Sequence, residues 1–213
     1  VFAVAAAYIH VFIANSKLQF LLQDFWFTVD REVLLSIPLF ILAGNVMSRG
    51  SIAKRLINFM SAFTAPIPGG LAVACVLACG AFAAINGSSI VTMLAIGTVM
   101  LPAMINGGYS SRFSLGVVMA GGTLGIIIPP SIPLILYGIM TEKNIAQLFV
   151  AGIGPGLLLT LMFSGYSLVV NRNIPRQYYS LGDAGRSLGR GVFALLLPVI
   201  IIGGIYSGKF SPT

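Results

Sequence analysis

Long apolar runs alternate with short polar segments along the chain and predict a series of membrane helices. A bilayer span needs about 20 apolar residues, or fewer where the helix is broken or re-entrant. The apolar runs are, in order, residues 1–14, 33–48, 71–85, 90–105, 113–128, 132–140, 145–170 and 191–206. Residues 15–32 read as a polar, aromatic connection, and the mixed run 51–64 reads as a helix lying along the membrane interface.

Helix-breaking residues interrupt two of these apolar regions. The first interruption is Asn86-Gly87-Ser88-Ser89, and the second is the proline-rich stretch from Gly125 to Pro133. A broken membrane helix exposes backbone groups that lipid cannot satisfy, so such breaks occur where they line a cavity or bind a ligand. Two breaks close together are typical of an ion and substrate site in a secondary transporter. The short arms 71–85 and 90–105 favour a re-entrant hairpin over two full crossings, although both arrangements leave the two ends on one side.

Composition and charge support an integral membrane protein. The chain is 57% hydrophobic and 8% charged, whereas soluble domains carry about 25% charged residues. If residues 172–190 are cytoplasmic, eight of the 12 Lys and Arg residues lie inside and four lie outside, as the positive-inside rule requires. Arg112 and Arg172 are among the eight. Because the basic residues are grouped between apolar runs, the net charge of +7 indicates membrane orientation and not nucleic-acid binding.

The breaks offer neutral oxygen ligands in a region without acids. No Asp or Glu occurs between Val33 and Thr141, and proton-coupled carriers generally use an embedded carboxylate or histidine. Hydroxyl, amide and backbone carbonyl oxygens suit a hard cation such as sodium, so sodium coupling is favoured. The sequence shows no motif for an organic cofactor, no nucleotide-binding loop and no catalytic constellation, so an enzyme is the least favoured class.

Each feature also has a simpler interpretation. Serines in membrane helices commonly bond to their own backbone, and Gly121 and Gly125, four residues apart, are typical of helix packing. Cys75 and Cys79 share one helix face and are expected to be small packing residues, since His10 is the only histidine. The site interpretation rests on the breaks occurring together.

Several segments resemble a known transporter family. They include Ile37-Pro-Leu-Phe-Ile-Leu-Ala-Gly-Asn45, Asn86-Gly-Ser-Ser89, Thr123-Leu-Gly-Ile-Ile-Ile-Pro-Pro-Ser-Ile-Pro133 and Leu148-Phe-Val-Ala-Gly152. In this order they resemble the large membrane subunit of the tripartite ATP-independent periplasmic (TRAP) transporters over most of the chain. The run from Ser88 to Gly97 is more similar to the C4-dicarboxylate branch. It departs from many relatives by having Thr92 where they have Asp, and Ile90 where they have Pro.

This resemblance implies a fold and a division of the chain. The expected fold is an all-α polytopic membrane protein, one half of an elevator-type transporter with two inverted repeats. Residues 1–64 would form scaffold spans and the interfacial helix, and residues 65–141 the transport unit, with its hairpin at 71–105 and its discontinuous helix at 113–140. Residues 142–213 would form further scaffold spans with a cytoplasmic basic loop at 172–190.

The resemblance also implies an activity, partners and a site. The family imports organic acids across the bacterial inner membrane with a sodium gradient, using a periplasmic substrate-binding protein and a small membrane subunit. The expected sodium ligands come from Asn86, Gly87, Ser88, Gly125, Pro129 and Ser131, and the expected substrate neighbours are Ser89, Thr92, Thr123 and Pro130. Among organic acids, the resemblance favours a C4-dicarboxylate as the substrate, with sialic acids and keto acids as the alternatives. A stand-alone sodium–dicarboxylate or citrate symporter, or a membrane scaffold subunit that transports nothing, are the alternatives.

Overall fold

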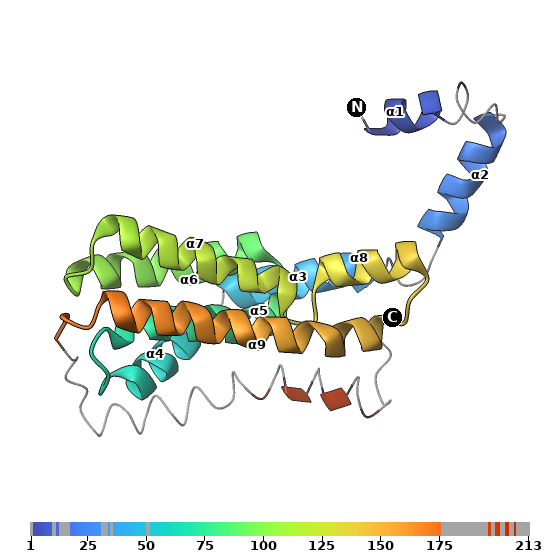
Figure 1. Ribbon diagram of the computed structural model, residues 1–213. Coiled ribbons are helices and arrows are strands. Elements are labelled where there is room, and N and C mark those ends of the chain that lie inside the picture. The colour runs from blue at the N-terminus through green and yellow to red at the C-terminus, as the bar shows by residue number, and fades with distance from the viewer. Residues whose placement is uncertain are drawn as a thin grey trace.

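The structure is a computed structural model that describes residues 2–9, 12, 18–30, 34, 36–49 and 52–175, and a few single positions between 196 and 207. Every regular element in this described part is a helix, as the sequence predicts (Figure 1). The helices are α1 (Phe2–Tyr8), α2 (Leu18–Val29), α3 (Ser36–Arg49), α4 (Ile52–Thr64), α5 (Gly70–Asn86), α6 (Ser89–Asn106), α7 (Ser111–Ile127), α8 (Ile132–Thr141) and α9 (Ile145–Val170).

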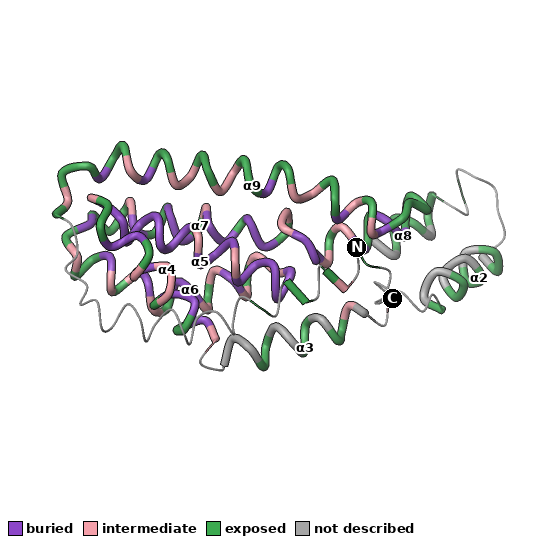
Figure 2. Tube along the Cα trace, turned by 90° about the horizontal axis from the view of Figure 1, so that it is seen from below, coloured by how far each residue is buried: buried purple, intermediate pink, exposed green. Residues whose placement is uncertain are grey.

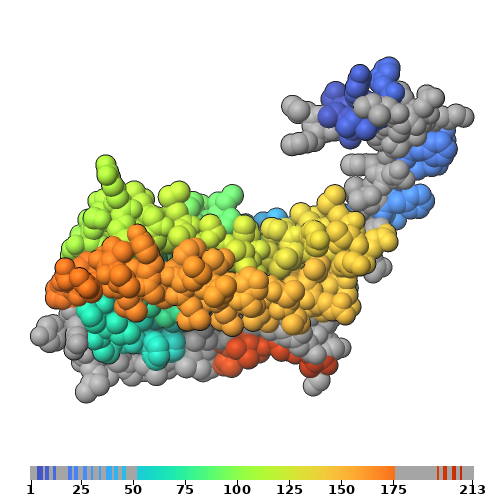
Figure 3. All heavy atoms as spheres, viewed as in Figure 1, coloured from blue at the N-terminus to red at the C-terminus, as the bar shows by residue number. Residues whose placement is uncertain are grey.

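The protein is an all-α membrane protein. Three helical stretches of the described residues are long and apolar enough to cross a bilayer, namely Ser89–Asn106, Ser111–Thr141 and Ile145–Val170. α9 lies on the surface of the bundle (Figure 3), and most of its large apolar side chains are exposed. Such a surface suits contact with lipid or with further membrane helices.

Most predicted boundaries lie within three residues of the observed ones. One segment differs, because the expected connection at 15–32 contains the 12-residue helix α2. Its sequence contains several Leu and Gln residues, which form helices readily, and Trp26 and Phe27 are exposed as an interfacial position requires. Most of the predicted basic loop 172–190 and of the run 191–206 lies outside the described residues.

α5 is the central helix of the bundle. Fifteen of its 17 residues are buried, and it packs against α4, α6, α7 and α9 (Figure 2). Its small side chains allow this close approach on several faces. At one contact, a Cβ atom on Gly121 of α7 would lie 2.8 Å from Cys79 Sγ. The buried Cys79 therefore packs directly against α7.

The base of the hairpin is fixed by a tyrosine from another turn. α5 begins after Gly69, which adopts φ 72° and provides no side-chain cap. The phenol of Tyr109, in the turn between α6 and α7, is buried beside Leu71 and Ala72 in the first turn of α5. Burial raises the pKa of this phenol above its ordinary value of 10.0. Tyr109 thus packs against the start of α5, where the Ala72 N–H group donates to the Gly69 carbonyl at 3.1 Å.

The hairpin and the discontinuous helix lie side by side. α5 and α6 are antiparallel and pack against α7, and α8 continues beyond α7 along α9 (Figure 1). The α7–α8 segment is 31 residues long with its break near the middle, whereas the arms of the hairpin have 17 and 18 residues. The tip of the hairpin meets the break and not the far end of α8. The division into scaffold and transport units at 64/65 and 141/142 stays a prediction, since α4 and α9 both pack against α5.

Candidate ion and substrate site

The hairpin tip turns on a left-handed glycine. α5 ends at Asn86 because Gly87 has φ 62° and ψ 19°, and the Gly87 N–H group donates to the Ala83 carbonyl at 2.9 Å. This is the usual way in which a helix ends, and glycine adopts it without steric strain. Ser88 is extended, and α6 begins at Ser89. The tip therefore places the C-terminus of one helix directly beside the N-terminus of the next.

A buried pair of polar side chains holds the tip closed. Asn86 is 1% exposed and Thr92 is 0% exposed. The Asn86 amide nitrogen donates to the Phe82 carbonyl at 2.7 Å and to Thr92 Oγ1 at 3.0 Å. The Asn86 amide oxygen accepts from the Ser88 N–H group at 2.8 Å and from Thr92 Oγ1 at 3.3 Å. These bonds satisfy groups that would otherwise be buried without partners.

The break between α7 and α8 follows from two prolines and a serine. α7 closes with the Ile128 N–H group donating to the Leu124 carbonyl at 2.9 Å. Pro129 and Pro130 are buried and have no N–H group to continue the helix. Ser131 is 1% exposed, and its hydroxyl donates to the Ile126 carbonyl at 2.7 Å before α8 begins. This hydroxyl satisfies one of the carbonyls at the end of α7.

Glycines allow the tip and the break to touch. The Ile132 N–H group at the start of α8 donates to the Gly87 carbonyl at 3.4 Å. A Cβ atom on Gly87 would lie 2.5 Å from the Pro130 oxygen, and one on Gly125 would lie 2.6 Å from the Ser88 oxygen. Backbone meets backbone at both positions, so no larger side chain fits without a shift of the chain.

Four helix ends converge at this contact. The C-termini of α5 and α7 present carbonyl oxygens with partial negative charge, and the N-termini of α6 and α8 present N–H groups with partial positive charge. Paired ends of this kind are suited to holding a cation on the carbonyl side and an anionic group on the N–H side. The contact between tip and break therefore has the chemistry of a combined ion and anion site.

Comparison with known proteins decides the family. The sequence model described as "Tripartite ATP-independent periplasmic transporter, DctM component" matches residues 1–213. The chain belongs to this TRAP family. It is 45% identical over 191 residues to the C4-dicarboxylate TRAP transporter large permease protein of Pseudomonas aeruginosa, covering 87% of this chain and 44% of that protein. It is 40% identical over 200 residues to the ectoine TRAP transporter large permease protein of Halomonas elongata, covering 92% of this chain and 47% of that protein.

TRAP relatives that are named for other substrates match as well. The isethionate TRAP transporter permease protein of Oleidesulfovibrio alaskensis is 38% identical over 197 residues, covering 87% of this chain and 30% of that protein. Membership of the family therefore does not identify which of these substrates a member transports. The chain spans less than half the length of these curated relatives.

Most of the residues predicted for the TRAP site lie at the contact of tip and break. Asn86, Gly87, Ser88 and Ser89 form the tip, and Gly125, Pro129, Pro130 and Ser131 form the facing surface. Thr92 lies one turn into α6 and bonds to Asn86. Thr123 is exposed on α7, where its hydroxyl donates to the Ala120 carbonyl at 2.7 Å.

The hydroxyls of Ser88 and Ser89 are the tip oxygens left for a ligand. Both residues are half-buried, and neither hydroxyl bonds to another of the described residues. The side chains of Asn86, Thr92 and Ser131 are already used in bonds within the protein. The individual assignments to sodium and substrate stay predictions.

The sequence reasoning missed one residue of the contact. A Cβ atom on Gly122 would lie 2.9 Å from the Met93 Cβ atom and 3.4 Å from the Ser89 oxygen. Gly122 therefore lets α7 approach the first turn of α6. The adjacent glycines Gly121 and Gly122 were the available signal, because a pair of glycines can serve two neighbouring helices at once.

Proposed function

We propose that this chain is part of a sodium-coupled permease that imports an organic acid across the bacterial inner membrane. The observation that carries the proposal is the direct contact between the hairpin tip and the α7–α8 break. Four helix ends, two of each polarity, meet there in an otherwise apolar bundle. Unwound backbone in a membrane bundle is retained where it binds a ligand.

Sodium is the coupling ion that this contact suits. Between Val33 and Thr141 the chain has no carboxylate that could relay a proton. The contact supplies neutral oxygens instead, from Ser88 and from backbone carbonyls at the ends of α5 and α7. We assign the sodium to this carbonyl side, between Gly87 and the Gly125–Ser131 stretch.

The N-terminal ends of α6 and α8 suit the acidic group of the substrate. Ser89 opens α6, and its half-exposed hydroxyl adds a donor beside the helix N-terminus. The substrates for which these relatives are named (C4-dicarboxylates, ectoine and isethionate) all carry a carboxylate or sulfonate group. A C4-dicarboxylate is the first substrate to test. A periplasmic binding protein would deliver it, and a small membrane subunit would support the permease.

Uptake by the intact parent transporter tests this proposal. The large and small subunits are reconstituted in proteoliposomes and given radiolabelled succinate, the binding protein and an inward sodium gradient. The double variant Ser88→Ala with Ser89→Ala removes both free tip hydroxyls. Thr98→Ala is the matched control, because it removes an exposed hydroxyl from α6 that bonds only within its own helix, to the Ala95 carbonyl at 3.2 Å.

We expect uptake to require both sodium and the binding protein, and the double variant but not the control to lose sodium dependence. Full sodium-dependent uptake by the double variant would refute the site and favour a scaffold subunit. Succinate uptake without the binding protein would favour a stand-alone symporter. Sodium-dependent uptake of another organic acid, without uptake of succinate, would change only the substrate.

A further inference from the structure

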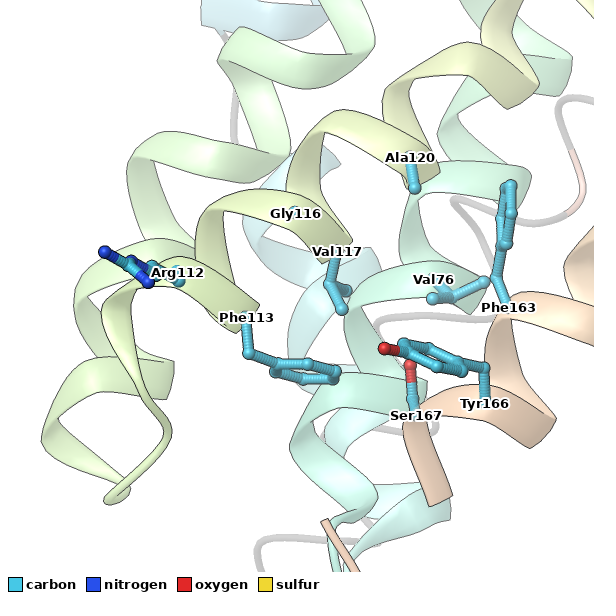
Figure 4. Close-up of a pocket in the computed structure, with 9 residues that line it drawn as sticks. All are labelled: Val76, Arg112, Phe113, Gly116, Val117, Ala120, Phe163, Tyr166 and Ser167. Carbon is cyan, nitrogen blue, oxygen red and sulfur yellow. The ribbon is translucent and has the colours of Figure 1, made fainter. Parts of the chain in front are cut away.

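A second cavity lies at the other end of α7, away from the hairpin tip. It has a volume of about 260 Å³ and lies between α5, α7 and α9 (Figure 4). Its lining includes Phe113, Gly116 and Ala120 of α7 and Phe163, Tyr166 and Ser167 of α9. Val76 of α5 forms part of its inner wall. Nothing in the proposed transport site uses these residues.

A buried hydroxyl in this cavity has no partner. Ser167 is 1% exposed, and its hydroxyl bonds to no group in the described part of the protein. In Figure 4 this hydroxyl is turned toward the other labelled side chains and not toward its own helix. A buried hydroxyl without a partner is unfavourable, so a ligand that offers an acceptor oxygen would be stabilised here.

The cavity lies at the cytoplasmic end of the bundle. Arg112 is the second residue of α7, and Arg172 follows the end of α9, so the two basic residues mark the same membrane surface. Stacked aromatic rings lie at the same end of the bundle. The ring centroids are 6.2 Å apart for Tyr109 and Phe113 and 6.4 Å apart for Phe113 and Tyr166. Stacked aromatic residues beside basic ones are typical of the headgroup region.

The rim of the cavity carries a positive charge, and its interior is apolar. Arg112 lies at the rim, and its guanidinium points outward, away from the Phe113 ring (Figure 4). No Asp or Glu occurs between Val33 and Thr141 to neutralise it from nearby in the sequence. An occupant should therefore combine an anionic group at the rim, an ester or similar oxygen near Ser167, and an apolar chain inside.

We propose that this cavity binds an anionic phospholipid of the cytoplasmic leaflet, with one acyl chain between α7 and α9 and the phosphate at Arg112. The phosphate accepts charge-assisted hydrogen bonds from the guanidinium, and a glycerol ester carbonyl accepts a hydrogen bond from Ser167. The size supports a lipid chain over a protein helix, whose diameter with side chains is about 10–12 Å. A cavity of about 260 Å³ with mainly apolar and aromatic lining has room for part of a single chain of methylene groups.

The test uses the intact parent transporter in phosphatidylcholine vesicles. They contain a small fraction of phosphatidylglycerol with a photoactivatable group in its acyl chain. Irradiation and peptide mapping locate the label. We expect label on the peptides that carry Phe113–Ala120 and Phe163–Ser167. Phosphatidylcholine has the same phosphate but neutralises it with its own choline cation, whereas phosphatidylglycerol keeps a net negative charge beside Arg112. Unlabelled phosphatidylglycerol should therefore compete at about tenfold lower concentration than phosphatidylcholine.

Two glycines give a matched pair of variants. A Cβ atom at Gly116 or at Gly165 would meet no atom within 4 Å, so a side chain can start at either position without a clash. Gly116 lines the cavity and Gly165 does not. Gly116→Leu should reduce the labelling about tenfold, whereas Gly165→Leu should leave it unchanged. Arg112→Gln should remove the preference for phosphatidylglycerol and retain labelling at the same peptides.

Three results would overturn the proposal. The first is equal labelling of Gly116→Leu and of the unaltered protein, when these two proteins melt at the same temperature. The second is equal competition by phosphatidylcholine and phosphatidylglycerol. The third is a cross-link from Gly116→Cys to another protein segment in the intact transporter, because that segment would then occupy the cavity.

Discussion

Substituting Gly87 tests whether the contact of tip and break is required. Gly87→Ala places a methyl group 2.5 Å from the Pro130 oxygen and 3.2 Å from the Ser131 Cα atom. Real Cβ atoms essentially never lie closer than 3.0 Å to such an atom. Because both neighbours are backbone atoms, the methyl group cannot be accommodated by a rotamer change. The tip must move away from the break.

The expected free-energy change has two parts. The left-handed backbone at φ 62° costs about 1–2 kcal/mol once a Cβ atom is present. Crowding a well-packed contact costs about 1–3 kcal/mol more. Gly108 provides the control, because it has φ 86° and a Cβ atom there would meet nothing within 4 Å. Gly108→Ala should lose only the backbone part of the free energy of unfolding. The difference in this free energy between the two variants therefore measures the contact of tip and break.

Thermal unfolding and sodium titration of uptake, both on the intact transporter, measure this difference. Gly87→Ala should melt at a lower temperature than Gly108→Ala. It should also need more sodium for half-maximal uptake, by about tenfold for each 1.4 kcal/mol lost from the ion-bound state. Equal melting temperatures and equal sodium dependence in the two variants would refute the reasoning.

Three further variants test individual contacts. Gly125→Ala should lower the melting temperature by crowding the tip backbone, whereas Gly165→Ala, which is open, should raise it slightly through helix propensity. Thr92→Val should cost about 1–3 kcal/mol of stability, measured by chemical unfolding, because it leaves the Asn86 amide partly unpaired. Tyr109→Phe should change the melting temperature little at neutral pH, because no hydrogen bond between the buried phenol and another of the described residues is lost. Because burial raises the phenol pKa above 10.0, the unaltered protein should show an additional loss of stability above that pH, absent from this variant.

The positions of the helices could be predicted from the sequence because each boundary has a local cause. Gly87 ends α5, and Pro129 and Pro130 end α7, whatever the rest of the fold does. The apolar runs between these residues fix the type of element, since a membrane helix satisfies its own backbone. The prediction of a connection at residues 15–32 is wrong for residues 18–29, which form α2. Polar and aromatic content marks a membrane interface, but it does not distinguish a loop from a helix there.

Side-chain partners within the site could not be predicted in the same way. The place of Thr92 beside the substrate stays a prediction, whereas its bond to Asn86 is a finding that depends on the turn at Gly87. Thr123 is two residues from Gly125 in the sequence, yet a helix rotates about 100° per residue and carries it to the exposed face. Such facts depend on how α5, α6 and α7 turn and pack against one another, which no local pattern encodes.

The contacts along α7 favour transport by movement of a whole body over opening between tip and break. Gly121 faces Cys79 of α5, Gly122 faces Met93 of α6, and Gly125 faces Ser88 at the tip. Separating the hairpin from α7 would break all three contacts together and lose packing along the full length of the hairpin. It would also pull apart the carbonyl and N–H groups that the proposed ion and substrate share. A displacement that carries the hairpin and the discontinuous helix together would keep the proposed site intact, as the elevator mechanism expected from the family resemblance requires.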